Sequence, residues 1–410
     1  MESYILDWAN LLLRWVHVIT AMAWVGASLY FVMLDNSLEP PTDKESQEKG
    51  VGGEQWAVHG GGFYNAQKYL VAPKVLPDHL HWSYWESYTT WITGFALFTV
   101  SYLWNASTYL IDKSLMAWSP GAAISVAIAF LAVFWVLYDG ICQLFGKGKS
   151  GDATVGALVA VLVCVASWLA CHWFAGRAAF LLVGAMLATT MSANVFFWII
   201  PGQRKNVAAL RAGQPVDPVH GVRGKQRSVH NTYFTLPVIF SMLSNHYSFT
   251  YTNPNNWVIL IFMMLGGALI RQFFVLRHSW KLGKRGNPLP YALVGVVIIA
   301  ALIYALRPEP FAMKSVAANS QGAQGASASV PIDYKQVQKV LAQRCYMCHG
   351  EQVQMKNVRL DSAEGVKQHA QAMYQQVVVT KIMPMNNATA ITDDERALIG
   401  SWFLAGAKVE

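Results

Sequence analysis

The sequence predicts an all-α protein, in which a polytopic helical membrane domain of about eight transmembrane helices precedes a small helical domain. Only 13% of the 410 residues are charged, whereas 54% are hydrophobic. A typical soluble domain carries about 25% charged residues. The first 306 residues contain eight apolar windows near the roughly 20 residues that cross a bilayer. The last 80 residues contain no such window and follow a stretch rich in Ala, Ser, Gly and Gln.

The eight windows divide the predicted membrane domain, residues 1–306, into spans and loops. They cover about 8–34, 83–104, 118–139, 153–174, 178–200, 232–249, 256–276 and 289–306. The window 232–249 is the least apolar, since it contains Pro237, Asn245 and His246. A span tolerates such residues where they face other helices.

The basic residues between the windows predict the orientation. Sixteen Lys and Arg lie in the loops 35–82, 140–152, 201–231 and 277–288. The loops on the other side contain only Lys113 and Arg177. Because positive loops stay in the cytoplasm, the even number of spans predicts that both termini lie on the outer side of the membrane. The net charge of +8 therefore reflects topology in a lipid bilayer, and no nucleic-acid partner is expected.

The C-terminal part carries the strongest motif. Residues 307–330 predict a flexible linker, and residues 331–410 a small folded domain. This domain contains Cys345-Tyr346-Met347-Cys348-His349, a CxxCH motif. Two thiols at this spacing form thioether bonds to the haem vinyl groups, and the following His is an axial iron ligand.

The CxxC pair has two other possible interpretations. A zinc site needs two further ligands, but the domain offers only His369. A thioredoxin-like redox pair requires a βαβ context, which the sequence does not predict. The motif therefore indicates one covalent haem c, bound by Cys345, Cys348 and His349.

The second axial ligand is expected further along the domain. Small c-type cytochromes place the ligand Met just before a Pro, which Met383 matches and for which Met385 is the second candidate. Thr392 to Glu395 matches a capping box that opens a final helix, and Trp402 is expected to pack on the helix before the CxxCH. These features predict an all-α class I cytochrome c domain with a His/Met iron of raised potential.

Several strings in the membrane domain carry a family resemblance. They are WAVHGGGFY at 56–64, HWSYWESYTTW at 81–91, NVFFWIIP at 194–201, HNTYFTLP at 230–237 and SNHY at 244–247. Together with the C-terminal CxxCH they resemble the bacterial membrane-bound urate oxidases (urate hydroxylases or dehydrogenases) with a fused cytochrome c domain, over essentially the whole chain.

The resemblance implies an oxidoreductase of purine catabolism that oxidises urate to 5-hydroxyisourate without producing hydrogen peroxide. Electrons would pass to the attached haem c and on to a soluble cytochrome c or a terminal oxidase. Composition and spacing alone predict only a membrane protein that delivers electrons to a c-type haem. A quinol or other small-molecule dehydrogenase remains an alternative, as does a transporter or membrane anchor that carries a cytochrome.

A site for urate must bind a planar anion, which calls for an aromatic plane, a cation and a proton acceptor. The predicted inner face offers these groups, and the residues predicted to be catalytic are His59, Lys68, His81 and Glu86. Phe63 and Tyr64 would stack on the ligand, Gly60–Gly62 would let backbone approach it, and Arg271 is a second candidate cation. In the alternative interpretation, the glycines form a turn and the charges lie among lipid headgroups.

Two intramembrane histidines suggest a second cofactor. On the predicted topology, His17 and His246 both lie in the outer half of the membrane. They are candidate ligands of a non-covalent haem b, and Arg14, three residues before His17 on the same helical face, would pair with its propionates. The alternative is that each histidine forms a hydrogen bond to a neighbouring helix.

Overall fold

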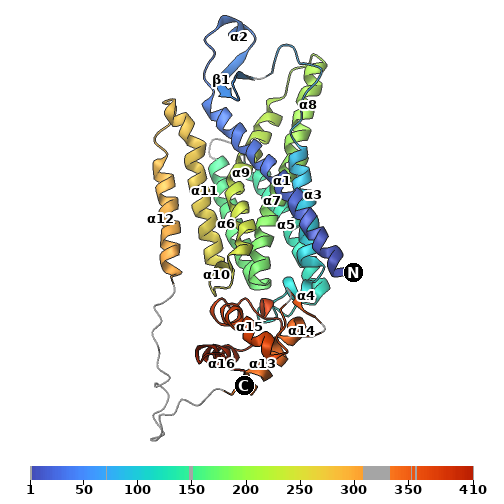
Figure 1. Cartoon of the computed structure of the whole chain (residues 1–410). Helices are drawn as coiled ribbons and strands as arrows, with labels where there is room; N and C mark the ends of the chain where they lie inside the picture. Colours follow the sequence, from blue (N-terminus) through green and yellow to red (C-terminus); the bar gives the residue numbers. More distant parts are fainter. Residues whose placement is uncertain are drawn as a thin grey trace.

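The computed structural model describes residues 2–70, 72–146, 151–307, 333–351, 353–355 and 358–409. This part is helical apart from one two-stranded sheet, which confirms the all-α class. Long helices form a bundle, and a cluster of short helices from the C-terminal residues lies at one end of it (Figure 1). All but the first residue of the predicted linker, 307–330, lies outside the described residues.

Every predicted span corresponds to a helix. The helices are α1 (Glu2–Ser37), α3 (Trp85–Phe98) continued by η1 (Thr99–Leu103), α5 (Pro120–Phe145), α6 (Gly151–Trp173), α7 (Gly176–Ala193) continued by η2 (Asn194–Ile199) and α8 (Ile200–Arg211), α9 (Pro218–Leu243), α11 (Asn256–Lys281) and α12 (Leu289–Ala305). Five helical segments are long and apolar enough to cross a membrane, beginning at Tyr4, Pro120, Gly151, Gly176 and Asn256. The short helices α2 (Lys44–Glu48), α4 (Ala106–Tyr109), η3 (Ser244–His246) and α10 (Ser248–Tyr251) lie between them.

Helix continues well beyond two of the apolar windows. The predicted loop 201–231 is mostly helical, because α8 runs to Arg211 and α9 begins at Pro218. The Asp217 carboxylate accepts a hydrogen bond from the Val219 amide at 2.9 Å, and Pro218 occupies the first helical position. Both features favour a helix start. Hydropathy marks where a helix enters lipid and does not mark where it ends in water.

A β-hairpin lies in the first long loop, where the sequence analysis predicted no strand. Strands β1 (Val51–His59) and β2 (Gly62–Tyr69) are antiparallel and joined by Gly60 and Gly61. These glycines have φ of 57° and 82°, which a two-residue hairpin turn with positive φ at both positions requires. The glycine run therefore forms a turn, and the hairpin lies at the end of the bundle away from the C-terminal helices (Figure 1).

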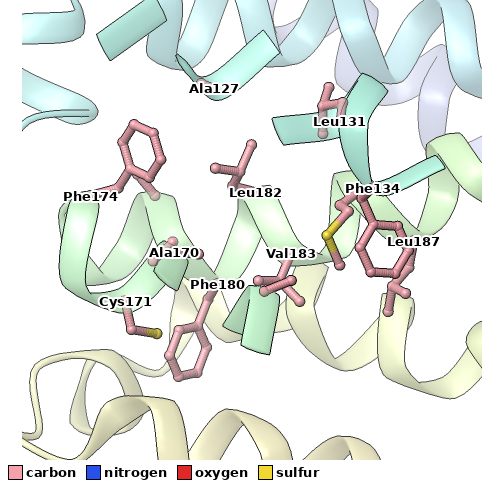
Figure 2. Close-up of a cluster of buried hydrophobic side chains, with 14 of the residues drawn as sticks. Ala127, Leu131, Phe134, Ala170, Cys171, Phe174, Phe180, Leu182, Val183 and Leu187 are labelled. Carbon is pink, nitrogen blue, oxygen red and sulfur yellow. The ribbon is translucent and has the colours of Figure 1, made fainter. Parts of the chain in front are cut away.

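Helix α7 lies at the centre of the bundle. Its side chains Phe180, Leu182 and Val183 are fully buried and pack with residues of α5 and of the end of α6 (Figure 2). Short Ala and Gly residues along α7 allow close helix packing, and Gly184 lies directly against Ser241 of α9. Because α5, α6 and α9 pack on α7, this helix fixes the relative positions of the helices around the candidate site.

The four basic loops lie together at one end of the bundle. Lys284 donates to the Leu38 carbonyl at 2.7 Å, and Arg211 donates to the Asp78 carbonyl at 3.1 Å. Gln226 donates to Asp152 at 2.8 Å. The start of α1 and the C-terminal helices lie at the opposite end (Figure 1). The four loops that the sequence groups by their basic residues thus lie at the same end of the bundle.

The C-terminal helices enclose their own apolar core. They are α13 (Tyr334–Arg344), α14 (Tyr346–His349), α15 (Ala363–Met373) continued by η6 (Tyr374–Val379), η7 (Met385–Asn387) and α16 (Asp393–Leu404). The predicted capping box is present, since Thr392 and Glu395 cap each other's backbone. Trp402 is 2% exposed and its ring lies 6.0 Å from that of Tyr334 on α13, as predicted.

Candidate functional site

The CxxCH motif lies where α13 ends and α14 begins. Cys345 is the residue between these helices, and Cys348 and His349 belong to α14. The His349 Nδ1 lies 3.3 Å from the Val358 carbonyl oxygen. Since a carbonyl oxygen only accepts hydrogen bonds, Nδ1 donates and Nε2 keeps its lone pair. His349 is thus oriented as an iron-ligating histidine requires.

Met383 lies in a loop whose backbone is held on both sides. Its amide donates to the Gln376 carbonyl at 3.0 Å, and its carbonyl accepts from Arg396 Nη1 at 2.7 Å. The same buried guanidinium also donates to the Val377 carbonyl. Arg396 on α16 therefore joins the end of η6 to the Met383 loop. Met385, the second candidate ligand, follows at the start of η7.

The two thiols of the motif are free in this structure and sit in surroundings of low polarity. Burial raises the pKa of both, and that of Cys345 to about 12. Among the described residues, no group of three or more His, Cys, Asp or Glu could hold a metal ion.

One cavity of about 2350 Å³ lies between the two parts of the chain. The C-terminal helices contribute Cys345, Cys348, His349 and both candidate methionines to its lining. The bundle contributes Arg14, His17, Arg177 and His246 among others. All four predicted haem c residues therefore line one space, which fits the group. The cavity exceeds the roughly 300–1,000 Å³ of ordinary ligand pockets.

His17 is fixed on the bundle side of this cavity. Its Nδ1 lies 3.1 Å from the Thr90 carbonyl oxygen and 3.1 Å from Thr93 Oγ1, both on α3. Nδ1 again donates, so Nε2 is left as an acceptor. Gly94 leaves room for the ring, because a Cβ there would lie 2.8 Å from His17 Cε1.

The SNHY string lies at the end of α9, beside the same cavity. Asn245 Oδ1 accepts hydrogen bonds from Arg177 Nε at 3.1 Å and from the Tyr102 hydroxyl at 2.9 Å. These bonds connect η3 with α7 and η1, and they hold the segment that carries His246. Arg177 lies in the first turn of α7, and none of the ion pairs among the described side chains includes it.

A second polar cluster is buried deeper in the bundle. Asn194, fully buried at the start of η2, donates to the Tyr138 hydroxyl at 3.0 Å and to Asn231 at 2.9 Å. The Tyr138 hydroxyl lies 2.8 Å from His230 Nδ1. The π-helical turn η2 places Asn194 here, and such turns are frequent at functional sites. In the sequence, His230 and Asn194 stood out as the first residues of two family strings, and Tyr138, 56 positions before Asn194, did not stand out at all.

A buried ion pair lies next to Tyr138 of this cluster. Arg227 Nη2 lies 2.7 Å from Asp139 Oδ1, and the two side chains are 3% and 13% exposed. The guanidinium also lies over the rings of Tyr138 and Trp198, at 5.0 and 5.2 Å from their centroids. Asp139 is the last residue of the apolar window 118–139, and an acidic residue at this depth needs a partner. This position in the sequence could therefore have predicted a buried ion pair.

Arg271, the second candidate cation, is buried in α11. It is 7% exposed, and its Nε and Nη2 have no hydrogen-bond partner in the described part of the chain. A buried guanidinium without an acceptor is costly. Gln272, the next residue, accepts a hydrogen bond from Tyr233 on α9.

The four residues predicted to be catalytic lie at the hairpin end. His59 ends β1 at the turn and is exposed, and His81 is exposed before α3. Lys68 pairs with Asp35, and Glu86 lies in the first turn of α3. No hydrogen bond or ion pair of the described residues joins two of these four. The structure places them at one end of the bundle without bringing them into one cluster.

Comparison with known proteins gives one match. A family model described as urate oxidase N-terminal matches residues 3–306. The match covers the helical bundle and ends with α12, so it does not include the C-terminal helices. No curated protein and no solved structure matches the chain.

Proposed function

The chain belongs to the urate oxidase N-terminal family, and we propose that it oxidises urate to 5-hydroxyisourate and delivers the electrons to a haem c bound by its own C-terminal helices. The family match supports a urate-oxidase-related protein, and the apolar helices support a location in a membrane. Urate and water give 5-hydroxyisourate, two protons and two electrons. The observation that carries the proposal is the cavity that the CxxCH residues share with the family domain.

The C-terminal residues have separate roles in holding the haem. Cys345 and Cys348 would form the thioether bonds, and His349 and Met383 would bind the iron. A haem with these ligands accepts single electrons at a raised potential. The Val358 carbonyl orients the imidazole of His349, and Arg396 fixes the backbone of the Met383 loop. Met385 remains the alternative ligand.

The substrate site is proposed at the bundle. His59, Lys68, His81 and Glu86 stay the proposed catalytic set, with a base among them to accept a proton from urate. Arg271 is proposed as the cation that binds the urate anion, because its buried Nε and Nη2 have no acceptor among the described residues. A bound anion would remove the cost of burying this guanidinium alone.

The proposed location is the bacterial inner membrane, with the start of α1 and the haem domain in the periplasm. The clustering of basic loops at the opposite end supports this orientation. Attachment of haem to CxxCH outside the cytoplasm agrees with it. From the haem, electrons would pass to a soluble cytochrome c or a terminal oxidase.

Substrate comparison tests the proposal. Purified full-length protein is mixed with oxidised cytochrome c and either urate or a quinol, and cytochrome reduction, 5-hydroxyisourate and hydrogen peroxide are measured. We expect reduction with urate, two cytochromes reduced per product molecule and no peroxide. Reduction by quinol alone would favour the other dehydrogenase class. Urate uptake into vesicles without any cytochrome reduction would favour a transporter.

A further inference from the structure

We propose that the bundle side of the shared cavity binds a second, non-covalent haem, with His17 as an iron ligand. His246 is the proposed ligand from η3. The inference deepens the proposed function, because it adds an electron carrier between the bundle and the covalent haem. It is argued from the cavity itself and does not depend on the identity of the substrate.

The hydrogen bonds of His17 leave its outer nitrogen free for a metal. Nδ1 donates to the Thr90 carbonyl at 3.1 Å, which fixes the tautomer and leaves the Nε2 lone pair available. Iron-ligating and zinc-ligating histidines are commonly held by such a bond from the other ring nitrogen. A histidine with only a structural role needs no contact beyond the one with α3. That contact occupies Nδ1 and leaves Nε2 without a use in the packing of α1 on α3.

Gly94 shows that the position of the His17 ring depends on space left by α3. A Cβ at residue 94 would lie 2.8 Å from Cε1 and 3.3 Å from Nδ1 of the imidazole. Any side chain at this position would therefore push the ring away from the Thr90 carbonyl. The close approach of α1 and α3 sets the direction of the proposed ligand.

Two cations in the cavity match the propionates of a haem. Arg14 lies one turn before His17 on α1, and within the described residues its guanidinium donates to Asn10 Oδ1 of its own helix and to no other helix. Arg177 contributes its Nε to Asn245. Neither forms an ion pair among the described residues, and both line the cavity. Guanidinium groups bind carboxylates through two parallel hydrogen bonds.

The size and walls of the cavity fit a second macrocycle. Its volume of about 2350 Å³ is about twice the roughly 1,000 Å³ upper range of single-ligand pockets. Away from the arginines, the bundle side is lined by apolar and aromatic residues such as Trp24, Phe95 and Leu181. Apolar walls with polar groups at the edge suit a porphyrin whose propionates point to the cations.

The electron balance is unchanged by this site. Each urate releases two electrons, which would leave the bundle one at a time, first to the second haem and then to the haem c. The two protons remain with water and the proposed base. A soluble oxidised cytochrome c removes each electron from the covalent haem, so two are reduced per urate.

Haem extraction tests the site without using urate. Acidified acetone removes non-covalent haem from the purified full-length protein and leaves thioether-bound haem. We expect about one extractable and one covalent haem per chain by the pyridine haemochrome spectrum. One covalent haem and no extractable haem would overturn the proposal, and so would a stoichiometric quinone in the extract in place of haem.

Matched variants locate the ligand. His17→Ala is expected to lose the extractable haem and keep the covalent one, and Gly94→Ala is expected to lose at least half of it. The controls are His172→Ala, whose side chain bonds Trp168 on its own helix, and Gly140→Ala, where a Cβ meets nothing within 4 Å. Retention of the extractable haem by His17→Ala would contradict the assignment, whatever the outcome of the urate assays.

Discussion

The two sides of the shared cavity are built in different ways. On the C-terminal side, the proposed ligands come from one stretch, residues 345–383, and the CxxCH residues are adjacent in the chain. On the bundle side, the lining comes from α1, α3, α7 and η3, with His17 and His246 more than 200 positions apart. The first side is specified by a local motif and the second by packing around α7.

This difference sets how each side responds to substitution. A single local change on the C-terminal side removes a covalent attachment, whereas the bundle depends on contacts between helices that are distant in sequence. Substitutions can therefore separate the delivery of electrons from the binding of substrate and from the stability of the bundle. Urate-dependent electron delivery should therefore be reduced most by changes at the haem c residues, less by changes at the substrate site and least by changes that only destabilise the bundle.

The largest effect is expected from Cys345→Ala combined with Cys348→Ala. Without thioether bonds, haem should be absent from the denatured chain, and urate-dependent reduction of soluble cytochrome c should be abolished. Haem staining on a denaturing gel and the cytochrome assay measure this. Cys164→Ala, at an exposed thiol on α6, is the control and should behave as wild type. Full activity in the double variant would show that electrons leave by another route.

The next effect concerns the four residues proposed as catalytic at the hairpin end. Alanine substitution of His59, Lys68, His81 or Glu86 should leave the free energy of unfolding within about 0.5 kcal/mol, as for other surface sites. Turnover of urate should fall, by about 100-fold for the member that acts as the base. Kinetics and thermal unfolding are measured on each variant. Unchanged turnover in all four would remove the catalytic set from the hairpin end.

A smaller effect is expected from Arg271→Gln. A hydrogen bond to a charged group contributes roughly 1.5–3 kcal/mol, so the KM for urate should rise about tenfold or more, with kcat less affected. Arg271→Lys should lie between this variant and wild type. Arg277→Gln, two turns further along α11, is the control. An unchanged KM in Arg271→Gln would show that the buried guanidinium does not bind urate.

The smallest effect on turnover and a large one on stability are expected from Asp139→Asn. This change leaves Arg227 buried without its carboxylate partner, which costs about 3–5 kcal/mol for a buried pair. Thermal unfolding in detergent measures the loss. Asp152→Asn is the control, since Asp152 bonds Gln226 at the exposed end of α6. Equal stability of the two variants would mean that Asp139 and Arg227 do not stabilise the bundle.

The parts that were predicted from the sequence depend on short-range patterns. The eight helices follow from apolar windows, and the cap of α16 from four consecutive residues. That Trp402 packs on the helix before the CxxCH was also predicted, although this contact, with Tyr334, joins two helices distant in sequence. The grouping of Cys345, Cys348, His349 and Met383 around one cavity agrees with the motif spacing.

The parts that were not predicted depend on packing between distant segments. Hydropathy gave no sign that α9 starts at Pro218, because its first turns are polar. The Gly60–Gly61 pair carried a hairpin signal, but the strands beside it are too mixed in polarity to stand out. The bond from Asn194 to Tyr138 joins η2 to α5, and no local pattern relates these positions.

The most direct test of the central claim is the spectrum of the covalent haem after urate is added without oxygen. Oxidised full-length protein is mixed anaerobically with a slight excess of urate, and the absorbance of the c-type haem is followed. We expect urate to reduce the covalent haem of the wild-type protein, whereas the Cys345→Ala/Cys348→Ala variant, which has no thioether bonds, should show no c-type haem absorbance. A covalent haem that stays oxidised with urate but is reduced by dithionite would contradict the account.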